Sequence, residues 1–190
     1  RLTPPNYEKI RMATNFGLSY GGSEANIALA LANLGVDSTF FSVVPNNSLG
    51  KSAVRSLRSN DVHCTPMILS TPEETPTHRL GTYYLETGYG IRASKVTYDR
   101  KHSAISEATP DEFDWDGIFG DADWFHVAGI TPAISPKAAV LVEAAMKAAK
   151  RHGVTVSVDL NYRAKLWTPE QAQAVMIPLM QYVDVCIGNE

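Results

Sequence analysis

Short apolar runs alternate with helical repeats in the second half of the chain. Three of these runs are rich in β-branched or aromatic residues, like the buried strands of parallel sheets: residues 123–128, 154–160 and 182–187. One helix is predicted to begin at Ser135, before a proline, and to end in basic residues before Gly153. A second is predicted to begin at Thr168, again before a proline. This alternation predicts a parallel α/β sheet covered by helices.

The first half of the chain continues the alternation. Residues 39–44 and 62–69 are predicted strands, and residues 48–58 are a predicted helix with apolar side chains at helical spacing. An alanine-rich helix is expected to end at Gly35, because glycine commonly follows the last turn of a helix. Its apolar stripe is predicted to consist of Ile27, Leu31 and Leu34.

The middle of the chain departs from this pattern. Residues 77–86 and 95–99 carry β-forming residues on either side of a glycine-rich turn, with no helix between them, which predicts an antiparallel pair. Residues 18–20 are a further candidate strand. We expect strands from about residues 7–20 and 77–99 to form a small sheet that acts as a lid, because open α/β sheets bind ligands at the carboxyl ends of their strands.

Composition and charge narrow the classes of protein. The 190 residues include 17 Lys and Arg against 20 Asp and Glu, a net charge of −3, so binding to nucleic acid or to an anionic membrane is disfavoured. With 44% hydrophobic and 19% charged residues, the composition is that of an ordinary folded domain. The longest apolar stretch, residues 138–149, carries two charges and is too short to span a bilayer. We expect one α/β domain over residues 1–190 that is incomplete at both ends.

Cysteine and histidine usage indicates neither a disulfide framework nor a structural zinc site. The two cysteines, Cys64 and Cys186, form no Cys-x-x-Cys motif. The five histidines have neither metal-ligand nor catalytic-triad spacing. We therefore expect no metal-ligating residues in this chain and a reducing, cytoplasmic location.

Two glycines open the alanine-rich helix. In the segment 21–26, Gly-Gly-Ser-Glu-Ala-Asn, Gly21 and Gly22 would let a ligand approach free backbone N–H groups, where the helix dipole favours anions or polar oxygens. Asn26, on the first turn, is placed to reach a bound hydroxyl. The alternative interpretation is a tight turn into a core helix, and a bare Gly-Gly pair is compatible with both.

Two nucleotide-binding patterns fail on inspection. Residues 49–52, Leu-Gly-Lys-Ser, resemble the end of a P-loop, but the position five residues before Gly50 is Pro45, which has no N–H to offer a phosphate. No Gly-x-Gly-x-x-Gly pattern follows any predicted strand. Residues 49–52 are therefore predicted to be an ordinary helix start, and a nucleotide-dependent oxidoreductase is disfavoured.

Two candidate binding residues belong to the predicted lid. Arg100 follows a lid strand, and its planar guanidinium suits bidentate recognition of a carboxylate, although a solvated charge cluster is an equal alternative. Tyr83 and Tyr84 point to opposite faces of their strand, so one of them should face the cleft and the other should face away.

Further candidates follow the predicted core strands. The segment 159–163 reads Asp-Leu-Asn-Tyr-Arg, and if the chain stays extended, Asp159, Asn161 and Arg163 point the same way. An arginine at this crevice is suited to neutralise phosphoryl charge during transfer, whereas a polar loop is the alternative. Asn189 lies at the carboxyl end of the last predicted strand.

Taken in order along the chain, these segments resemble the PfkB (ribokinase-like) carbohydrate kinase family. The segment 21–26 is similar to the amino-terminal signature of the family, and residues 44–50 are similar to its Val-Gly-x-Asp-x-x-Gly motif, with departures at Pro45 and Asn47. Three segments look most like 2-keto-3-deoxygluconate kinases: residues 98–104, 128–133 and 159–167. The likeness covers nearly the whole chain.

The resemblance implies an α/β core with a β-sheet lid, and an enzyme that uses ATP and Mg²⁺ to phosphorylate a small sugar acid. The substrate it implies is 2-keto-3-deoxygluconate, and the product is the 6-phosphate. By motif match, Gly21, Gly22 and Asn26 would contact the sugar. Tyr83 and Arg100 would contact it from the lid, and Arg100 would pair with the substrate carboxylate.

The resemblance also assigns residues to the phosphoryl-transfer side. Arg163 would be a catalytic residue that bridges the substrate and the transferring phosphate, and Asn161 and Asn189 would lie on the nucleotide and magnesium side. The Gly-Ala-Gly-Asp motif, which supplies the catalytic Asp base of the family, is absent from these 190 residues. Because a general base is required, this chain alone is expected at most to bind sugar weakly.

Two other functions stay open. One is a kinase for a neutral sugar such as fructose or ribose, which would have no use for a cation at Arg100. The other is a sugar-binding module that kept the fold and lost the chemistry. A homo-oligomer formed through the lid sheet is also left open by the sequence.

Overall fold

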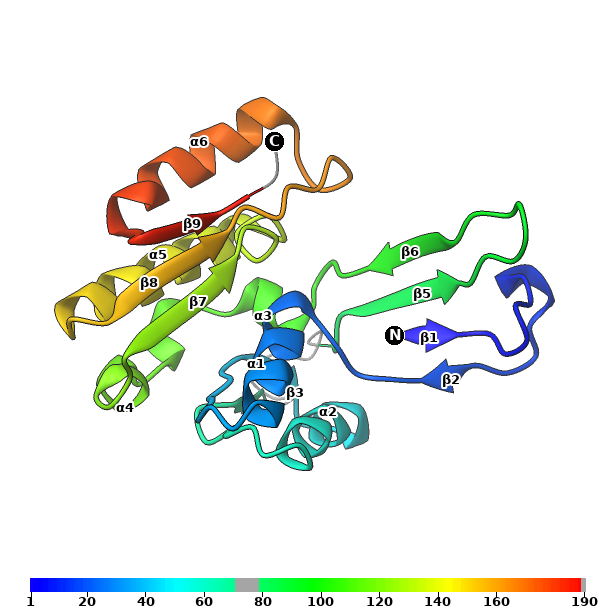
Figure 1. Ribbon diagram of the computed structural model, residues 1–190, viewed down its shortest axis with the longest axis horizontal. Coiled ribbons are helices and arrows are strands. Elements are labelled where there is room, and N and C mark those ends of the chain that lie inside the picture. The colour runs from blue at the N-terminus through cyan, green and yellow to red at the C-terminus, as the bar shows by residue number, and fades with distance from the viewer. Residues whose placement is uncertain (71–78, 189–190) are drawn as a thin grey trace.

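Three parallel strands form the sheet of the second half of the chain, in the order β7-β8-β9 (Figure 1). The computed structural model describes residues 1–70 and 79–188. The central strand is the most deeply buried, with Val156 and Val158 at 0% exposure. The bounds of the strands are β7 (Trp124–Ala128), β8 (Thr155–Asp159) and β9 (Val185–Ile187). The predicted runs 123–128 and 154–160 are therefore confirmed.

The third predicted run, residues 182–187, is strand only over its second half. A 3-10 turn, η3 (Met180–Tyr182), precedes β9. Asp184 then exchanges two hydrogen bonds with Val156: its amide donates to the carbonyl at 2.9 Å, and its carboxylate accepts from the Val156 amide at 2.8 Å. The Asp184 carboxylate thus accepts from the Val156 amide, as a main-chain carbonyl would in a regular sheet, and β9 begins one residue later.

Two helices with well-formed amino termini lie beside this sheet. The Ser135 hydroxyl accepts from the Ala138 amide at 3.0 Å at the start of α5 (Pro136–Arg151). Thr168 and Gln171 form a reciprocal capping box at the start of α6 (Pro169–Leu179). Both predicted helix starts are confirmed. Between the helices and the sheet lies a core that includes Met146, at 0% exposure.

A two-stranded parallel sheet belongs to the first half of the chain. It pairs β3 (Val43–Pro45) with β4 (Ile68–Ser70), and α2 (Ser48–Arg58) connects them. The strands predicted over residues 39–44 and 62–69 begin too early and are too long. The residues before β3 and β4 contribute only an isolated bridge, from Thr39 to His63.

The helix start at residues 48–52 is confirmed. The Asn47 side chain accepts from the amides of Leu49 and Gly50 at 3.0 Å and caps α2. A Cβ on Gly50 would lie 2.0 Å from the Pro45 carbonyl oxygen, so this glycine is explained by a close backbone approach. Its role is to let α2 pack against the end of β3.

Helix α1 (Ser23–Asn33) buries a different face from the one predicted. Ala28 is 7% exposed and packs in a cluster with Val54 of α2, whereas Leu34 is 79% exposed and Leu31 is 38% exposed. The stripe of Ile27, Leu31 and Leu34 was therefore wrong. The packed face consists of Ala25, Ala28, Leu29 and Ala32. The three alanines of this face recur at helical spacing and let the α1 backbone approach its neighbours closely.

A four-stranded sheet projects from the rest of the molecule (Figure 1). Its order is β2-β1-β5-β6, with β5 antiparallel to β6 and β1 parallel to β5. The bounds are β1 (Leu2–Thr3), β2 (Gly17–Leu18), β5 (Thr82–Glu86) and β6 (Lys95–Asp99). β1 lies before the range 7–20 in which we expected the first of these strands. Of the predicted run 77–86, residues 77 and 78 lie outside the described part of the chain.

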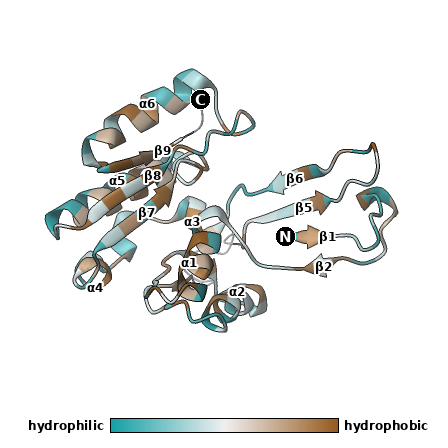
Figure 2. Ribbon diagram, viewed as in Figure 1, coloured by the Kyte–Doolittle hydropathy of each residue, from teal (hydrophilic) through white to brown (hydrophobic). Residues whose placement is uncertain are grey.

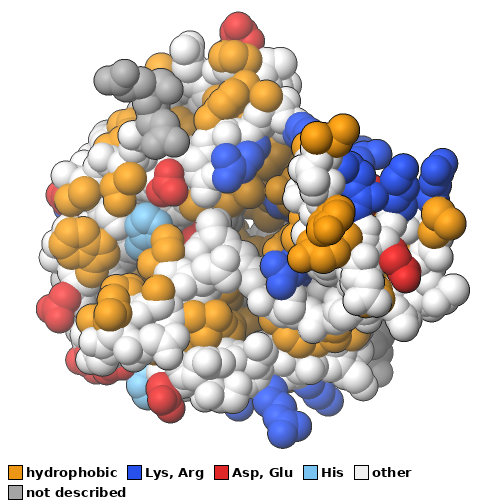
Figure 3. Space-filling view, turned by 45° about the vertical axis from the view of Figure 1, so that its right-hand side comes forward, with side chains coloured by type: hydrophobic (Ala, Val, Ile, Leu, Met, Phe, Trp, Pro, Cys, Tyr) orange, Lys and Arg blue, Asp and Glu red, His pale blue; other side chains and the backbone are white. Residues whose placement is uncertain are grey.

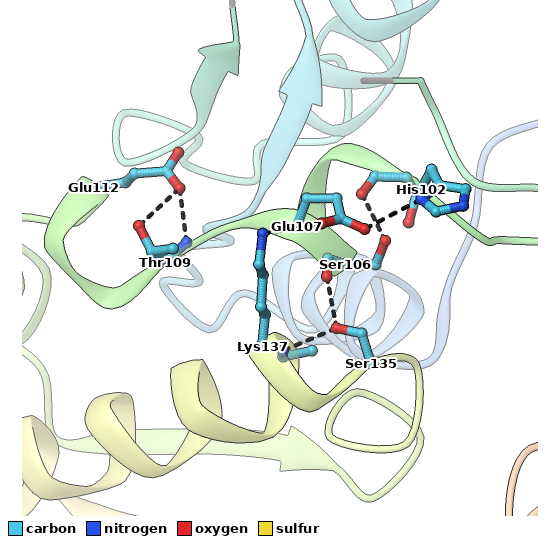
Figure 4. Close-up of polar contacts among 9 residues, drawn as sticks. His102, Ser106, Glu107, Thr109, Glu112, Ser135 and Lys137 are labelled. Atoms are coloured by element: carbon cyan, nitrogen blue, oxygen red, sulfur yellow. Dashed lines mark hydrogen bonds and ion pairs between the residues drawn. The ribbon is translucent and has the colours of Figure 1, made fainter. Parts of the chain in front are cut away.

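Short elements join the four-stranded sheet to the core. Glu107, the last residue of α3 (Ala104–Glu107), pairs with Lys137 of α5 at 3.0 Å and with His102 at 3.4 Å (Figure 4). The remaining short elements are η1 (Ile10–Met12), η2 (Pro110–Glu112) and α4 (Trp115–Phe119). Among the described residues, no helix has the length and apolar character that crossing a membrane requires.

Candidate functional site

The Gly-Gly segment forms an exposed loop that leads into α1. Gly22 is the N-cap residue, in an extended conformation with φ of −177°, and no side chain caps the helix here. A Cβ on Gly22 would meet only the Ala25 Cβ, at 3.8 Å, which is an ordinary contact. Neither the backbone conformation nor the packing of the described residues therefore requires glycine at position 22.

Gly21 is explained by a neighbouring side chain. A Cβ at this position would lie 3.1 Å from Oδ1 of Asn26, so the Asn26 amide lies against the Gly21 backbone. Asn26 is itself exposed, one turn into α1. The structure thus brings together Gly21, Gly22 and Asn26, three of the residues that the sequence selected, at one helix end with open backbone amides.

Aromatic and cationic side chains gather on one face of the β5–β6 pair. Tyr83 and Tyr98 are opposite each other in the ladder, with ring centroids 5.9 Å apart. The Arg100 guanidinium carbon lies 3.8 Å from the Tyr98 ring centroid, within range of a cation–π interaction. Tyr84 points the other way, toward Phe16, with centroids 6.1 Å apart. Tyr83 is therefore the tyrosine that shares a face with Arg100.

Arg100 follows β6 and Arg163 lies beyond β8, and the charge of Arg163 acts on Arg100. Burial lowers the pKa of the Arg100 guanidinium, the Tyr98 and Tyr83 hydroxyls oppose that change, and the positive charge of Arg163 lowers the pKa further. Figure 3 shows Lys and Arg side chains on both sides of the central hollow of the molecule. Among the described residues, no carboxylate lies within 4.0 Å of either guanidinium. This arrangement is suited to an anion.

The segment 159–163 turns away from an extended course. The Asp159 carboxylate accepts from the Asn161 amide at 3.0 Å, and Asn161 has a positive φ of 39°. This local turn is the kind that aspartate and asparagine favour. The chain does not stay extended here, so the condition under which Asp159, Asn161 and Arg163 would point the same way is not met. Arg163 is exposed beyond the turn, and its Nη1 donates to the Tyr162 carbonyl at 3.2 Å.

A cavity of about 1250 Å³ reaches from the Gly-Gly loop into the interior. Gly21, Gly22 and Tyr83 line its mouth, while Phe40 and Phe125 belong to its apolar interior. Asn26, Arg100, Asn161 and Arg163 do not line it. Of the described candidate residues, only Gly21, Gly22 and Tyr83 therefore contact the cavity, and the others lie outside it.

The two expected ligands, Mg²⁺ and the phosphates of ATP, fit these residues differently. The described part of the chain holds no group of three or more His, Cys, Asp or Glu side chains that could bind a metal ion. A magnesium site is therefore not built from these residues alone. The Arg163 guanidinium and the side-chain NH₂ of Asn161 fit phosphate oxygens by their chemistry, and Asn189 lies outside the described residues.

Sequence reasoning missed Glu24. Its carboxylate accepts from the Ala128 amide at 3.1 Å and from the Thr131 hydroxyl, across more than a hundred residues of sequence. The only local signal was an acidic residue in the first turn of a helix, which is common because it complements the helix dipole. Nothing in the pattern points to its distant partners.

Comparison with known proteins gives a consistent result. The sequence pattern of the pfkB family of carbohydrate kinases matches residues 3–190. The 2-dehydro-3-deoxygalactonokinase of Haloferax volcanii is 35% identical over 190 residues, which are 100% of this chain and 58% of that protein. The 2-dehydro-3-deoxygluconokinase of Bacillus subtilis is 34% identical over 169 residues, 89% of this chain and 50% of that protein.

Solved structures share the fold. The crystal structure of 2-dehydro-3-deoxygluconokinase from Thermotoga maritima has a TM-score of 0.93 and 48% identity, covering 100% of this chain and 56% of that one. A putative ribokinase II from E. coli, at 17% identity, has a TM-score of 0.85. The expected ribokinase-like α/β fold is confirmed. The chain spans between 50% and 58% of the length of the three relatives with names of the 2-dehydro-3-deoxy sugar kinases.

Proposed function

The chain belongs to the pfkB family of carbohydrate kinases, and from this premise we propose that it is the sugar-binding part of a kinase for a sugar acid. The proposed reaction transfers a phosphoryl group from ATP to a hydroxyl of 2-keto-3-deoxygluconate. The observation that carries the choice of an acid is the pair of guanidinium groups, Arg100 and Arg163, with no carboxylate within 4.0 Å among the described residues. An anionic substrate would neutralise both.

Substrate binding is assigned to two sides of the hollow. Gly21, Gly22 and Asn26 would bind sugar hydroxyls, since glycine at position 22 has no other explanation in the described structure. The four-stranded sheet would act as the lid, with Tyr83 against the sugar ring and Arg100 on the carboxylate. The face of Tyr98 holds the Arg100 side chain, so little conformational freedom is lost on binding.

Arg163 is the proposed catalytic residue. Phosphoryl transfer depends mainly on positioning and on neutralisation of negative charge, and an arginine supplies both. Bound ATP would supply the phosphoryl group, with Asn161 and Asn189 on the nucleotide side. We assign no step to Mg²⁺, because the described residues form no metal-binding group. The general base is not assigned to any of these residues.

Two properties of the whole protein are also proposals. We infer a cytoplasmic location, which is supported by Cys64 and Cys186 being unpaired thiols. Pairing of two copies through the four-stranded sheet stays a prediction, and sedimentation velocity of the purified protein tests it.

A titration of sugars tests the assignment. We expect the purified protein to bind 2-keto-3-deoxygluconate more tightly than fructose or ribose in isothermal titration calorimetry. Arg100→Ala should weaken binding of the acid about 10- to 100-fold, the loss of a charge-assisted hydrogen bond, and leave the neutral sugars unaffected. Lys95→Ala, which removes an exposed cation from the other end of β6, is the matched control.

The alternatives predict different results. Equal affinity for fructose and for the acid, with Arg100→Ala harmless, would favour a neutral-sugar kinase. Tight binding of the acid without any sugar phosphate detected by ³¹P NMR after addition of ATP to the full-length protein would favour a non-catalytic module.

A further inference from the structure

Glu24 reaches from the first turn of α1 to the carboxyl end of β7. Its Oε1 accepts from the Ala128 amide at 3.1 Å and from the Thr131 hydroxyl, while its Oε2 accepts from the Ser23 hydroxyl. The carboxylate therefore joins the Gly-Gly loop, the last residue of one core strand and the turn that follows that strand.

The Ala128 amide needs an acceptor on this side. Within the described residues β7 is the outer strand of the order β7-β8-β9, and Ala128 is 1% exposed. The next amide, that of Gly129, donates to the Asp159 carbonyl of β8 at 2.7 Å, so the Ala128 amide points to the opposite, unpaired side. A buried N–H without an acceptor is costly, and the Glu24 carboxylate accepts a charge-assisted hydrogen bond from this amide.

The core end of this connection is tightly packed. A Cβ on Gly129 would lie 2.3 Å from the Leu160 carbonyl oxygen, which shows how closely the turn after β7 approaches the end of β8. The loop end is exposed, and among the described residues its own main-chain bond is the donation from the Asn26 amide to the Gly22 carbonyl, at 2.8 Å. Glu24 thus ties an open loop to a fixed part of the sheet.

We propose that Glu24 is a positioning residue for the sugar-binding loop. It holds the Gly21 and Gly22 amides and the Asn26 side chain at a fixed distance from the carboxyl ends of the core strands. The inference rests on the proposed function, in that this loop binds the substrate. Glu24 itself touches no substrate in this proposal, and it acts through the loop backbone.

Three substitutions of Glu24 distinguish the effect of its negative charge from the effect of its side-chain length. Glu24→Gln keeps the length of the side chain and an oxygen acceptor for Ala128 and Thr131. Glu24→Asp keeps the charge but is one methylene shorter, so it loses the reach across to β7. Glu24→Ala removes both. Glu143→Ala, on the exposed face of α5 with its partner Lys147, is the matched control for loss of an acidic residue.

The experiment combines NMR hydrogen exchange with sugar titration on the same purified protein. Glu24→Ala and Glu24→Asp should each raise the exchange rate of the Ala128 amide at least tenfold. They should also lower the heteronuclear NOE of Gly21 and Gly22 and raise the Kd for 2-keto-3-deoxygluconate about tenfold. Glu24→Gln should restore both properties to within about threefold of the wild type, and Glu143→Ala should match the wild type.

Two results would overturn the inference. One is unchanged Ala128 exchange in Glu24→Asp, a variant that retains the charge and the packing of α1. The other is increased exchange with unaltered sugar affinity, because the contact would then support the fold without positioning the loop. Failure of the proposed function is distinct: the wild type itself would bind no sugar acid, whereas Ala128 exchange would still report on the Glu24 contact.

Discussion

The β7–β9 sheet and the four-stranded sheet differ in how they use their side chains. The central strand β8 has Val156, Ser157 and Val158 at 2% exposure or less. In the four-stranded sheet every residue of β5 is half-buried, and four of the five residues of β6 are exposed. Figure 2 shows a contrast in hydropathy, with hydrophobic colour along β9 and hydrophilic colour in β6, although the three residues of β9 are exposed.

Because of this difference, the two sheets contribute differently to stability and to ligand recognition. A strand covered on both faces contributes free energy of unfolding through buried apolar surface, and its side chains have no access to a ligand. The β5–β6 pair contributes less of that energy, and the face that carries Tyr83, Tyr98 and Arg100 stays available to a ligand. Substitutions in the first sheet should therefore change folding, and substitutions in the second should change binding.

The largest expected effect is in the core. Met146 of α5 has 0% exposure, and Met146→Ala should lower the free energy of unfolding by about 2–5 kcal/mol through lost burial and a cavity. Val140→Ala, on the same helix at 56% exposure, and Thr97→Ala, on the exposed face of β6, should each stay within about 0.5 kcal/mol. Urea denaturation measures all three. A loss at Thr97 as large as that at Met146 would contradict the comparison.

Substitutions at the two ends of α1 should have smaller effects, on stability at one end and on sugar binding at the other. Gly35 has a φ of 79°, so Gly35→Ala should lower the free energy of unfolding by about 1–2 kcal/mol without changing sugar affinity. Gly22 is extended, with room for a Cβ, so Gly22→Ala should leave stability nearly unchanged and weaken sugar binding. Thermal melts and calorimetric titration of both variants test this. Equal sugar affinity in the wild type and Gly22→Ala would remove Gly22 from the proposed site.

The core sheet could be predicted because its signals are local and repeated. Continuous apolar runs marked β7 and β8, and the caps at Ser135 and Thr168 marked the starts of α5 and α6. These features are decided by residues a few positions apart. The two-residue strand β1 has no pattern to detect, since any periodicity needs a longer run.

The site was harder to predict because its geometry depends on distant partners. The residue types at positions 21–26 and 100 suggested ligand binding, but nothing indicated which α1 face would be buried or where Arg163 would lie. The turn at Asn161 changed the direction of Arg163, and its signal was the Asp-x-Asn spacing that favours such turns. Glu24 was missed because Ala128 and Thr131 are 104 and 107 residues away.

The smallest expected effect lies at the junction of the two regions, where α3 follows β6 and meets α5 (Figure 4). The hydrogen bond from Lys137 holds the pKa of Glu107 below its ordinary value of 4.5, with a smaller contribution from His102. A lowered pKa in the folded state means that this stabilisation is present above pH 4.5 and is lost as the pH falls through the folded-state pKa. Because the groups are partly exposed, it should amount to less than about 1 kcal/mol.

The measurement is the difference in unfolding free energy between the wild type and Glu107→Gln, in urea, from pH 6 down to pH 3. Subtracting the two curves removes the titration of other carboxylates, so the wild type should be more stable at pH 6 and the difference should shrink as the pH falls through the lowered pKa of Glu107. High salt should reduce the difference at pH 6. Lys137→Met should remove most of it, because Lys137 is the main cause of the shift. A difference that is independent of pH, or that persists without Lys137, would mean that the junction is held by packing, as the core is, and not by charge.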